Sequence, residues 1–512
     1  MFLKALELHL EAEKPIVILN KSDAEELDVR PLDRVEIVFK NKKLVGTVNI
    51  AKKFVKPGYI GLYETISKQM RLKTGDRVKV SRTEPPTSIE FIKKKLNGSQ
   101  LTGKEINQII KDVVSKKLSD VELTTFVVSL HNHGMSMDEV ASLSEAMAFT
   151  GDILDLGKEE IYDKHSIGGC PGDKTSMILV PTVAAAGLTI PKTSSRSITS
   201  PAGTADKMEC LSPVDLSVEE IKKVVKKTNG CLVWGGAVNL APADDMFIEI
   251  EHPLSIDPLL LPSVMSKKKA VGCKYLVIDI PTGKNAKIKS VQEAEKLASK
   301  FIELGKRLDI KVSCLSTYGE QPIGHNIGPA LEAREALETL MNKKNPKDLL
   351  DKVCDLVGNL FRFRGIKEPE KKAFQIIKSG KAEKKFREII EAQGGNRKVK
   401  PEDIPVGDKK VKIHSAKGGF VLWINNSDII KLARTAGAPK DKGAGIVIHK
   451  KIGDKVKKGD ILFEIYAEKA YKLNRALKLA EEMDVYGIGK KYEMMLAKIP
   501  KEKNNSYFVL ER

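Results

Sequence analysis

The sequence predicts a multidomain α/β protein with a small N-terminal β-barrel-like module, a helical subdomain, a large α/β domain with a mostly parallel sheet, and a C-terminal α+β (barrel-sandwich-like) domain. Three observations lead to this prediction. The 512 residues are too many for one ordinary core, and 41% of them are hydrophobic. Apolar residues alternate near the N-terminus and then follow a helical period. Beyond residue 188, short apolar runs alternate with amphipathic segments.

Residues 1–85 are expected to form the barrel-like module from two related halves. Apolar positions alternate at 35–38 and 78–80, which is typical of short strands. The segment from Leu27, L-D-V-R-P-L-D-R-V-E-I, recurs from Met70 as M-R-L-K-T-G-D-R-V-K-V. We interpret the recurrence as an internal duplication. Such a module could bind a ligand, but a role in packing or assembly is favoured, because a fold alone does not specify a site.

A helical domain is expected over residues 86–187. Its helix starts are indicated by capping boxes, in which Ser or Thr is followed three residues later by Glu: Thr102/Glu105, Ser119/Glu122 and Ser136/Glu139. The α/β domain is expected over 188–400, where apolar runs such as 231–234 and 275–280 alternate with amphipathic helices.

Residues 401–512 are expected to form the C-terminal α+β domain. The turn at 453–460, followed by I-L-F-E-I, resembles the hairpin of biotinyl and lipoyl barrel-sandwich modules. No lysine stands in the sequence context that is modified in those modules. A structural role for this domain is therefore favoured.

The formal net charge of +19 comes mostly from lysines spread over the whole chain. Such a field attracts small anions and nucleic acid alike, so the charge alone does not select a partner. The six cysteines show no C-x-x-C spacing, which disfavours a disulfide framework or a structural metal. There is no leader-like N-terminus and no apolar run of 18 residues. We therefore expect a cytoplasmic protein without a membrane partner.

The first segment that carries chemistry is D-K-H-S-I-G-G-C-P-G-D-K-T-S, residues 163–176. Glycine pairs alone more often mark turns than phosphate loops. Here they lie among hydroxyls and lysines, directly before an apolar run that predicts a helix. Backbone N–H groups and the positive end of a helix dipole favour an anion at such a place. The pattern points to phosphate.

The second segment, residues 193–200, carries six hydroxyl side chains around Arg196 and precedes P-A-G-T. A hydroxyl-rich loop on its own is more often a solvated turn than a binding site. Its occurrence shortly after the glycine-rich segment favours a second anion-binding loop.

Three motifs in this order resemble the thymidine and pyrimidine nucleoside phosphorylases: K-H-S-x-G-G…G-D-x-x-S, then S-x-R…G-T-x-D-K-x-E, then L-A-P-A-D at 240–244. The similarity runs from about residue 89 to the C-terminal region. In that family, residues of the first two motifs hold the attacking phosphate. The resemblance implies phosphate contacts at Lys164, Ser166, Ser176, Ser194 and Thr204.

Three departures from that family bear on the substrate. The glycine loop is one residue longer, and hydroxyls replace glycines around Arg196, which adds hydrogen-bond donors suited to a second phosphate. Glu251 stands where the pyrimidine enzymes place an arginine that binds the base carbonyl. A carboxylate there disfavours a base with carbonyls.

With these departures the chain is similar to the archaeal AMP phosphorylases, which also carry I-G-G-x-P-G, T-S-S-R-x-I-T-S and N-G-C-x-V-W-G-G. The similarity covers essentially the whole chain. It implies phosphorolysis of a nucleoside 5′-monophosphate to base and ribose 1,5-bisphosphate, with Asp257 as proton donor. It further implies nucleotide contacts at Gly169, Ser195, Arg196, Ser197, Ile198, Thr199, Ser200, Thr204, Ser263 and Lys287.

A general acid must remain protonated near neutral pH, and the apolar residues 258–261 favour this for Asp257. Without the resemblance, an Asp-Pro turn explains Asp257 equally well. Ser263 lies two residues nearer to Asp257 than the family pattern predicts. Lys267 aligns with a base-contacting lysine, although an exposed lysine is the ordinary explanation. For Asp279, a helix or turn cap is favoured over a ligand contact.

AMP and inorganic phosphate are the expected ligands, with CMP and UMP as alternatives that the sequence does not rank against AMP, and no metal or organic cofactor is expected. The resemblance implies at least a homodimer through the helical domain, with the N-terminal extension able to join dimers. The alternatives are a pyrimidine nucleoside phosphorylase and a non-catalytic nucleotide-binding regulator. A nucleic-acid-binding role is disfavoured because no aromatic RNA-binding pattern or basic recognition helix is present.

Overall fold

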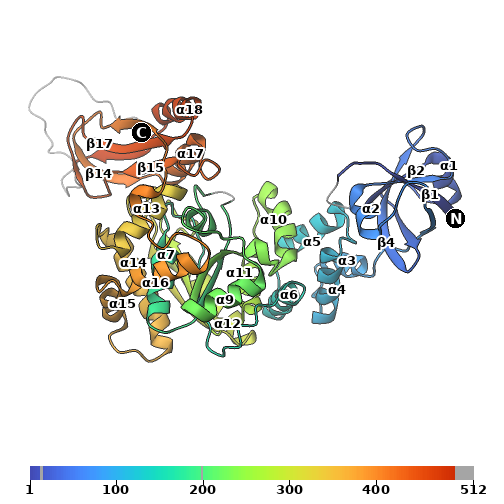
Figure 1. The fold of residues 1–512 in the computed structure, drawn as a ribbon, viewed down its shortest axis with the longest axis horizontal. Coiled ribbons are helices and arrows are strands. Elements are labelled where there is room, and N and C mark those ends of the chain that lie inside the picture. Colours follow the sequence, from blue (N-terminus) through green and yellow to red (C-terminus); the bar gives the residue numbers. More distant parts are fainter. Residues whose placement is uncertain (12–14, 198–199, 491–512) are drawn as a thin grey trace, which may run out of the picture. The chain divides into compact units, whose positions relative to one another are not determined.

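A computed structural model of the chain describes residues 1–11, 15–197 and 200–490 (Figure 1). The chain divides into two compact units. Unit 1 contains Met1–Leu154 and Asn239–Gly272, and unit 2 contains Asp155–Val238 and Cys273–Arg512. Neither unit is a continuous stretch of sequence. No helix among the described residues is long and apolar enough to cross a membrane.

The N-terminal part of unit 1 is a closed β-barrel with strand order β1-β5-β2-β4-β3-β6. The strands alternate between buried and more exposed side chains, and Val35, Ile37, Val78 and Val80 are fully buried in the barrel core. The elements are β1 (Phe2–Glu7), β2 (Ile16–Asn20), α1 (Lys21–Glu26), β3 (Arg34–Phe39), β4 (Lys42–Ala51), β5 (Tyr59–Leu62), α2 (Glu64–Met70) and β6 (Arg77–Arg82).

The two recurring segments of the barrel have the same local structure. Each leaves a short helix, makes a turn and enters a strand. In the turns, Asp33 accepts a hydrogen bond from the N–H of Arg30 at 2.9 Å, and Asp76 accepts one from the N–H of Lys73 at 2.8 Å. The repeated aspartate therefore closes the same turn in both segments.

The rest of unit 1 is helical. The three predicted capping boxes are confirmed at the starts of α4, α5 and α6, where the hydroxyl of each N-cap residue accepts from the third helical N–H and the Glu side chain returns the bond. The helices are α3 (Ser88–Leu96), α4 (Gly103–Val114), α5 (Asp120–His133), α6 (Met137–Phe149), α10 (Pro242–Leu254) and α11 (Leu260–Ala270).

Unit 2 is built on parallel strands, as the alternation of strands and helices predicts. Strand β10 (Tyr275–Thr282) lies between β11 (Lys311–Tyr318) and β7 (Tyr162–Ser166), and β8 (Ile190–Ser194) pairs with β9 (Gly230–Trp234). Because the strands are parallel, their carboxyl ends meet at one edge, where ligands bind in open α/β sheets. The register places Ser166 opposite Asp279 at that edge.

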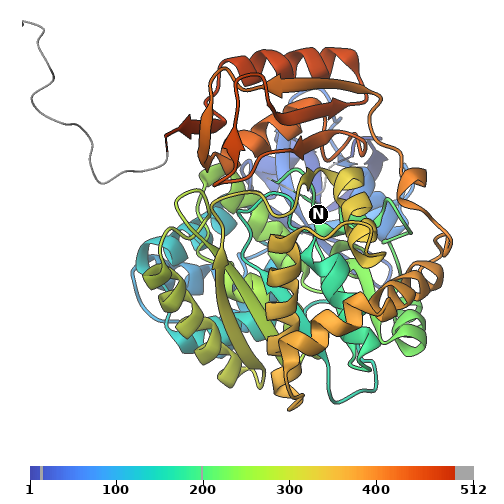
Figure 2. The same ribbon diagram turned by 90° about the vertical axis from the view of Figure 1, so that its left-hand side faces the viewer.

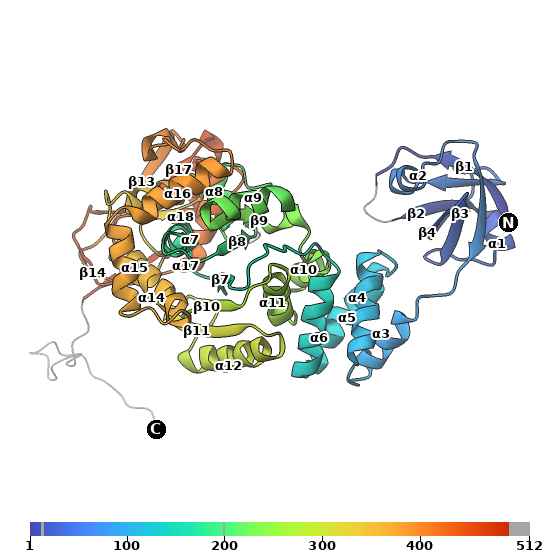
Figure 3. The ribbon, with the colours of Figure 1, turned by 60° about the horizontal axis from the view of Figure 1, so that its bottom comes forward.

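Helices cover these strands on both sides (Figure 3). Helix α7 is buried on every side over Thr175–Ala184, which is why its sequence is apolar without a polar face. The helices are α7 (Thr175–Ala185), α8 (Thr204–Met208), α9 (Val218–Thr228), α12 (Val291–Arg307), α13 (Pro329–Leu340), α14 (Lys347–Phe363), α15 (Pro369–Lys378) and α16 (Lys381–Ala392), with 3₁₀ turns at Gly235–Val238 and Pro401–Asp403.

The C-terminal part of unit 2 contains two antiparallel sheets, β12-β15-β17-β13 and β16-β14-β18. Helix α18 lies along the outer side of the first of these sheets (Figure 2). The elements are β12 (Asn326–Ile327), β13 (Lys409–His414), β14 (Gly419–Ile424), α17 (Asn426–Ala436), β15 (Gly445–Ile448), β16 (Lys455–Val456), β17 (Ile461–Ala467), α18 (Ala470–Glu481) and β18 (Tyr486–Gly489).

Candidate active site

The glycine loop, residues 167–174, connects the carboxyl end of β7 to the first turn of α7. Gly168 and Gly169 have φ values of +84° and +89°, a conformation that L residues rarely adopt. A Cβ atom on Gly169 would lie 2.7 Å from the backbone nitrogen of Lys287. The structure therefore brings two predicted nucleotide-binding residues, Gly169 and Lys287, into close approach. Both are exposed.

The additional residue of this loop has a structural explanation. Cys170 is buried, and its thiol donates a hydrogen bond to the carbonyl oxygen of Gln321 at 3.0 Å. Burial raises the pKa of Cys170 to about 12, so the side chain is a neutral thiol at neutral pH. The longer loop is thus held by a buried donor to a distant segment.

Asp279 is the carboxylate that four other side chains contact at the edge of the parallel strands, and we call it the hub of the site. It is fully buried, and its two carboxylate oxygens accept hydrogen bonds from the Ser166 hydroxyl at 2.8 Å and the Thr317 hydroxyl at 2.6 Å. The Lys352 ammonium lies 2.8 Å away and that of Lys164 lies 3.8 Å away. The prediction that Asp279 caps a helix or turn is wrong, because its carboxylate organises side chains from three other elements.

The charges at this edge are balanced between lysines and carboxylates. Lys164 also lies 3.6 Å from Asp173 in the glycine loop. Burial acts to raise the pKa of Asp173, but the ammonium groups of Lys164, Lys352 and Lys207 outweigh it and hold that pKa far below its ordinary value. Burial acts to lower the pKa of Lys352, and Asp279 and Asp173 raise it instead. These shifts favour the charged forms of Asp173 and Lys352 beside the glycine loop.

Ser176 is buried in the first turn of α7, and Ser194 ends β8, where its hydroxyl donates to the carbonyl of Val233 at 3.2 Å. Lys207, on α8, donates to the carbonyl of Asp173 at 2.7 Å and pairs with Glu332 at 2.8 Å. Lys207 thereby ties the helix that begins at Thr204 to the glycine loop. Four of the five predicted phosphate contacts lie on β7, α7 or α8, and Ser194 ends β8.

The hydroxyl loop, residues 195–203, is closed by Asp206. One carboxylate oxygen of Asp206 accepts hydrogen bonds from the N–H groups of Ser197 and Gly203, both at 2.8 Å. The hydroxyl of Ser197 contacts Ser200 through its Oγ atom at 3.0 Å. Ser195 is exposed, and Ser197, Ser200 and Thr204 are half-buried. The predicted contacts Ile198 and Thr199 lie outside the described residues.

The guanidinium of Arg196 contacts residues outside this loop. It donates two hydrogen bonds to Glu209, at 2.8 and 2.7 Å, and lies over the ring of Trp234 at 4.9 Å. The hydrogen bonds from Arg196, together with Lys442, lower the pKa of Glu209 to about 2. Arg196 thus fixes the loop to the scaffold.

Asp257 and Ser263 belong to unit 1. Asp257 lies between α10 and α11 and is exposed within this unit, so residues 258–261 do not enclose it there. Glu251 is buried, and its carboxylate accepts a hydrogen bond from the N–H of Leu259 at 3.1 Å. Lys267 forms an ion pair at 2.5 Å with the buried Asp244 of L-A-P-A-D. Lys267, on α11, is half-buried, and its ion-pair partner lies on α10.

Sequence reasoning missed the residues that organise the two loops, namely Asp206, Glu209, Thr317 and Lys352. Asp206 and Glu209 are the aspartate and the glutamate of the motif G-T-x-D-K-x-E, so that motif could have identified them. Lys352 lies in the middle of an amphipathic helix, and no local pattern distinguishes it from a surface lysine. Among the described residues, no group of three or more His, Cys, Asp or Glu side chains could hold a metal ion.

Comparison with known protein families divides the chain in the same order as the structure. The helical bundle domain of a glycosyl transferase family matches residues 89–151, and the α/β domain of that family matches residues 158–383. The pyrimidine nucleoside phosphorylase C-terminal domain matches residues 420–486. A solved structure, anthranilate phosphoribosyltransferase from Thermus thermophilus, has a TM-score of 0.50 at 17% identity, covering 59% of this chain and 98% of that one. That likeness concerns the fold alone.

Curated relatives match over nearly the whole chain. An AMP phosphorylase of Thermofilum pendens is 48% identical and covers 96% of this chain and 96% of its own length. AMP phosphorylase 1 of Archaeoglobus fulgidus is 49% identical, covering 94% of this chain and 96% of its own. An AMP phosphorylase of Thermococcus kodakarensis is 50% identical, covering 91% and 94%. This chain therefore belongs to the AMP phosphorylase family.

Proposed function

We propose that the protein catalyses the phosphorolysis of AMP, in which AMP and orthophosphate give adenine and ribose 1,5-bisphosphate. The observation that carries the proposal is the 48–50% identity to curated AMP phosphorylases over 91–96% of the chain. The two loops support it, because the reaction must hold two phosphate groups: the hydroxyl loop leads into α8, which Lys207 ties to the glycine loop.

We assign the attacking phosphate to the glycine-loop side. Lys164 and the α7 N-terminus favour an anion electrostatically, and Ser176, Ser194 and Thr204 supply hydroxyl donors. Ser166 would donate to this phosphate by turning its hydroxyl away from Asp279. A negatively charged nucleophile held in this way meets C1′ with its orientation already set, which lowers the entropic part of the barrier.

We assign the 5′-phosphate and ribose to the hydroxyl loop and its neighbours. Ser195, Arg196, Ser197, Ile198, Thr199, Ser200 and Thr204 would supply backbone and hydroxyl donors, with Gly169, Ser263 and Lys287 completing the nucleotide contacts. The guanidinium of Arg196 acts mainly by holding the loop, because Glu209 already occupies its two parallel N–H groups. Apart from Thr204, which is assigned to both phosphates, this assignment gives the substrate's own phosphate its own donors.

We assign proton donation to Asp257. Breaking the C1′–N9 bond transfers the bonding electrons to adenine, while the sugar gains oxocarbenium character and the phosphate oxygen forms the new bond to C1′. A proton delivered to purine N7 makes adenine a better leaving group.

The same proposal includes CMP and UMP as further substrates and an oligomer of at least two chains. It also divides the chain into domains at residues 85, 187 and 400.

Incubation of the full chain with AMP, with and without orthophosphate, tests this function. The proposal expects adenine and ribose 1,5-bisphosphate in equal amounts, and only when both reactants are present. Release of thymine from thymidine at a higher rate would instead identify a pyrimidine nucleoside phosphorylase. Binding of AMP without phosphate-dependent release of adenine would identify a regulator.

A further inference from the structure

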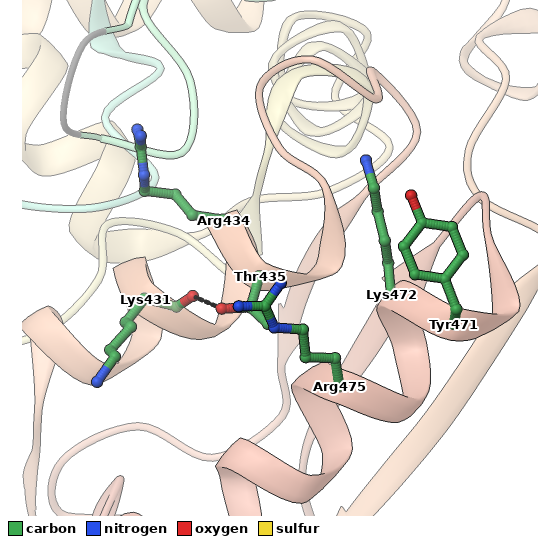
Figure 4. A pocket seen from close by; sticks show the side chains of 6 residues that line it. All are labelled: Lys431, Arg434, Thr435, Tyr471, Lys472 and Arg475. Atoms are coloured by element: carbon green, nitrogen blue, oxygen red, sulfur yellow. Dashed lines mark hydrogen bonds between the residues drawn. The ribbon is translucent and has the colours of Figure 1, made fainter.

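A basic cavity of about 470 Å³ lies in the C-terminal part of unit 2, between α17 and α18 (Figure 4). Lys431, Arg434 and Thr435 of α17 and Tyr471, Lys472 and Arg475 of α18 line it. Among the described residues that line it, four are cations and none is acidic. The motifs of the proposed reaction do not include any of these six residues.

The packing of the two helices explains how the cavity forms. On α17, Leu432, Ala433 and Ala436 are buried in the core, and so is Ala476 on α18. The lining residues recur at intervals of three and four on each helix, which places them on the same outward side of their helix. The small buried residues bring the helices close together, so that residues of both helices line one cavity.

Four cations in one cavity repel one another, and a bound anion removes that repulsion. Carboxylates outside the lining balance part of this charge, because Lys472 pairs with Asp441 at 2.7 Å and Lys431 interacts electrostatically with Asp428. Lys431 and Arg475 are exposed on opposite sides of the cavity, on different helices. An anion with several charged groups in a row could contact cations of both helices at once.

The cavity also offers an aromatic surface and has the size of a small-molecule site. Tyr471 is 63% exposed, and exposed tyrosine rings beside cations stack against nucleic-acid bases. A volume of about 470 Å³ lies within the range of pockets that hold small organic ligands. A base on Tyr471 and a phosphate chain across the cations would use both features.

We propose that this cavity is a binding site for a chain of linked phosphates, carried by a nucleoside polyphosphate, that is distinct from the two loops of the candidate active site. Arg434 connects the two regions, because its guanidinium donates a hydrogen bond to the carbonyl of Ser200 at 3.2 Å. A ligand on Arg434 therefore acts directly on the hydroxyl loop. This connection rests on the proposed function, whereas binding at the cavity does not.

Calorimetric titration of the full chain with inorganic tripolyphosphate and with ATP at physiological salt tests the binding. The double variant Lys431→Ala/Arg475→Ala should weaken tripolyphosphate binding at least about tenfold, because each lost charge-assisted contact is worth about a factor of ten. The matched control Lys440→Ala/Lys478→Ala removes the same charge from positions outside the cavity and should bind as the unchanged protein does. Equal weakening in both double variants would mean diffuse surface attraction and would overturn the site.

The two ligands distinguish the sources of the phosphate chain. Tyr471→Ala should weaken ATP binding and leave tripolyphosphate binding unchanged. If ATP binds no more tightly than tripolyphosphate and is insensitive to Tyr471→Ala, the nucleoside part of the proposal is overturned. Tight binding of a single-stranded RNA decamer without binding of either small ligand would overturn the proposal in favour of a nucleic-acid surface.

The connection to the hydroxyl loop is tested separately by AMP turnover. Saturating tripolyphosphate should change the KM for AMP at least about twofold in the unchanged protein and not in Lys431→Ala/Arg475→Ala. An identical response in both proteins would assign the effect to competition at the active site and would overturn the connection. If neither protein turns over AMP, the proposed function fails, while the binding experiment still decides the site.

Discussion

The carboxylate of Glu251 accepts a hydrogen bond from the N–H of Leu259 at 3.1 Å, while its own backbone carbonyl accepts one from Ile256 at 3.2 Å. These two bonds hold both ends of the segment that carries Asp257. Glu251 is buried, and Leu259 is completely buried. Glu251 therefore has a structural task within unit 1, namely to hold the segment that carries the candidate acid.

Glu251→Ala should lower kcat for AMP phosphorolysis about 100-fold, because a displacement of a reacting group by about 1 Å costs that much. The KM for AMP should change much less. Glu251→Gln keeps an acceptor oxygen for the Leu259 N–H and should retain most of the activity. A KM effect that exceeds the kcat effect would contradict a positioning role.

Asp257→Asn should abolish nearly all turnover while AMP still binds, because asparagine keeps the shape of the side chain and cannot deliver the proton. Removal of general acid catalysis typically costs a factor of about 10²–10⁴. Single-turnover kinetics and AMP titration by calorimetry give both quantities on one protein sample. Retained turnover would remove Asp257 as the acid.

Asp279→Asn should destabilise unit 2, since it leaves the buried ammonium groups of Lys164 and Lys352 without their shared carboxylate. Breaking a buried ion pair on one side costs about 3 kcal/mol, which corresponds to a fall in Tm of at least about 5 °C. Asp351→Asn is the control, because Asp351 is exposed on the same helix as Lys352. Equal Tm values for the two variants would contradict the assignment of Asp279 as the hub.

These contacts also show what the sequence could and could not predict. The capping boxes of α4, α5 and α6 were predictable because both partners lie within one helical turn. The glycine loop was predictable because a loop that binds an anion through backbone N–H groups requires only flexible residues next to the start of a helix. Both features are visible in the local sequence. In contrast, Ser166 and Asp279 are 113 residues apart, and only the parallel register of β7 and β10 brings them together. The contact between Arg196 and Trp234 likewise depends on the pairing of β8 with β9, which brings the two residues together.

The stability of the protein should depend on pH through the ionisation of Glu209. The hydrogen bonds from Arg196, together with Lys442, lower its pKa from 4.5 to about 2. A carboxylate with a lowered folded-state pKa stabilises the protein above its unfolded-state pKa, and that contribution is lost as the pH falls toward the folded-state pKa. The Tm difference between the unchanged protein and Glu209→Gln should therefore be constant above about pH 5.5 and shrink between about pH 4.5 and 2. A difference that does not vary over this range would contradict the ion pair.

The ratio of kcat/KM for AMP to kcat/KM for adenosine at saturating orthophosphate, with adenine release assayed again in the absence of orthophosphate, tests the central claim that one site holds two separate phosphate groups. Loss of two charge-assisted hydrogen bonds, at about 1.5 kcal/mol each, predicts that AMP is preferred at least about 100-fold. It also predicts that adenine is not released without orthophosphate. Cleavage of adenosine as fast as AMP, or release of adenine in the absence of orthophosphate, would contradict the account.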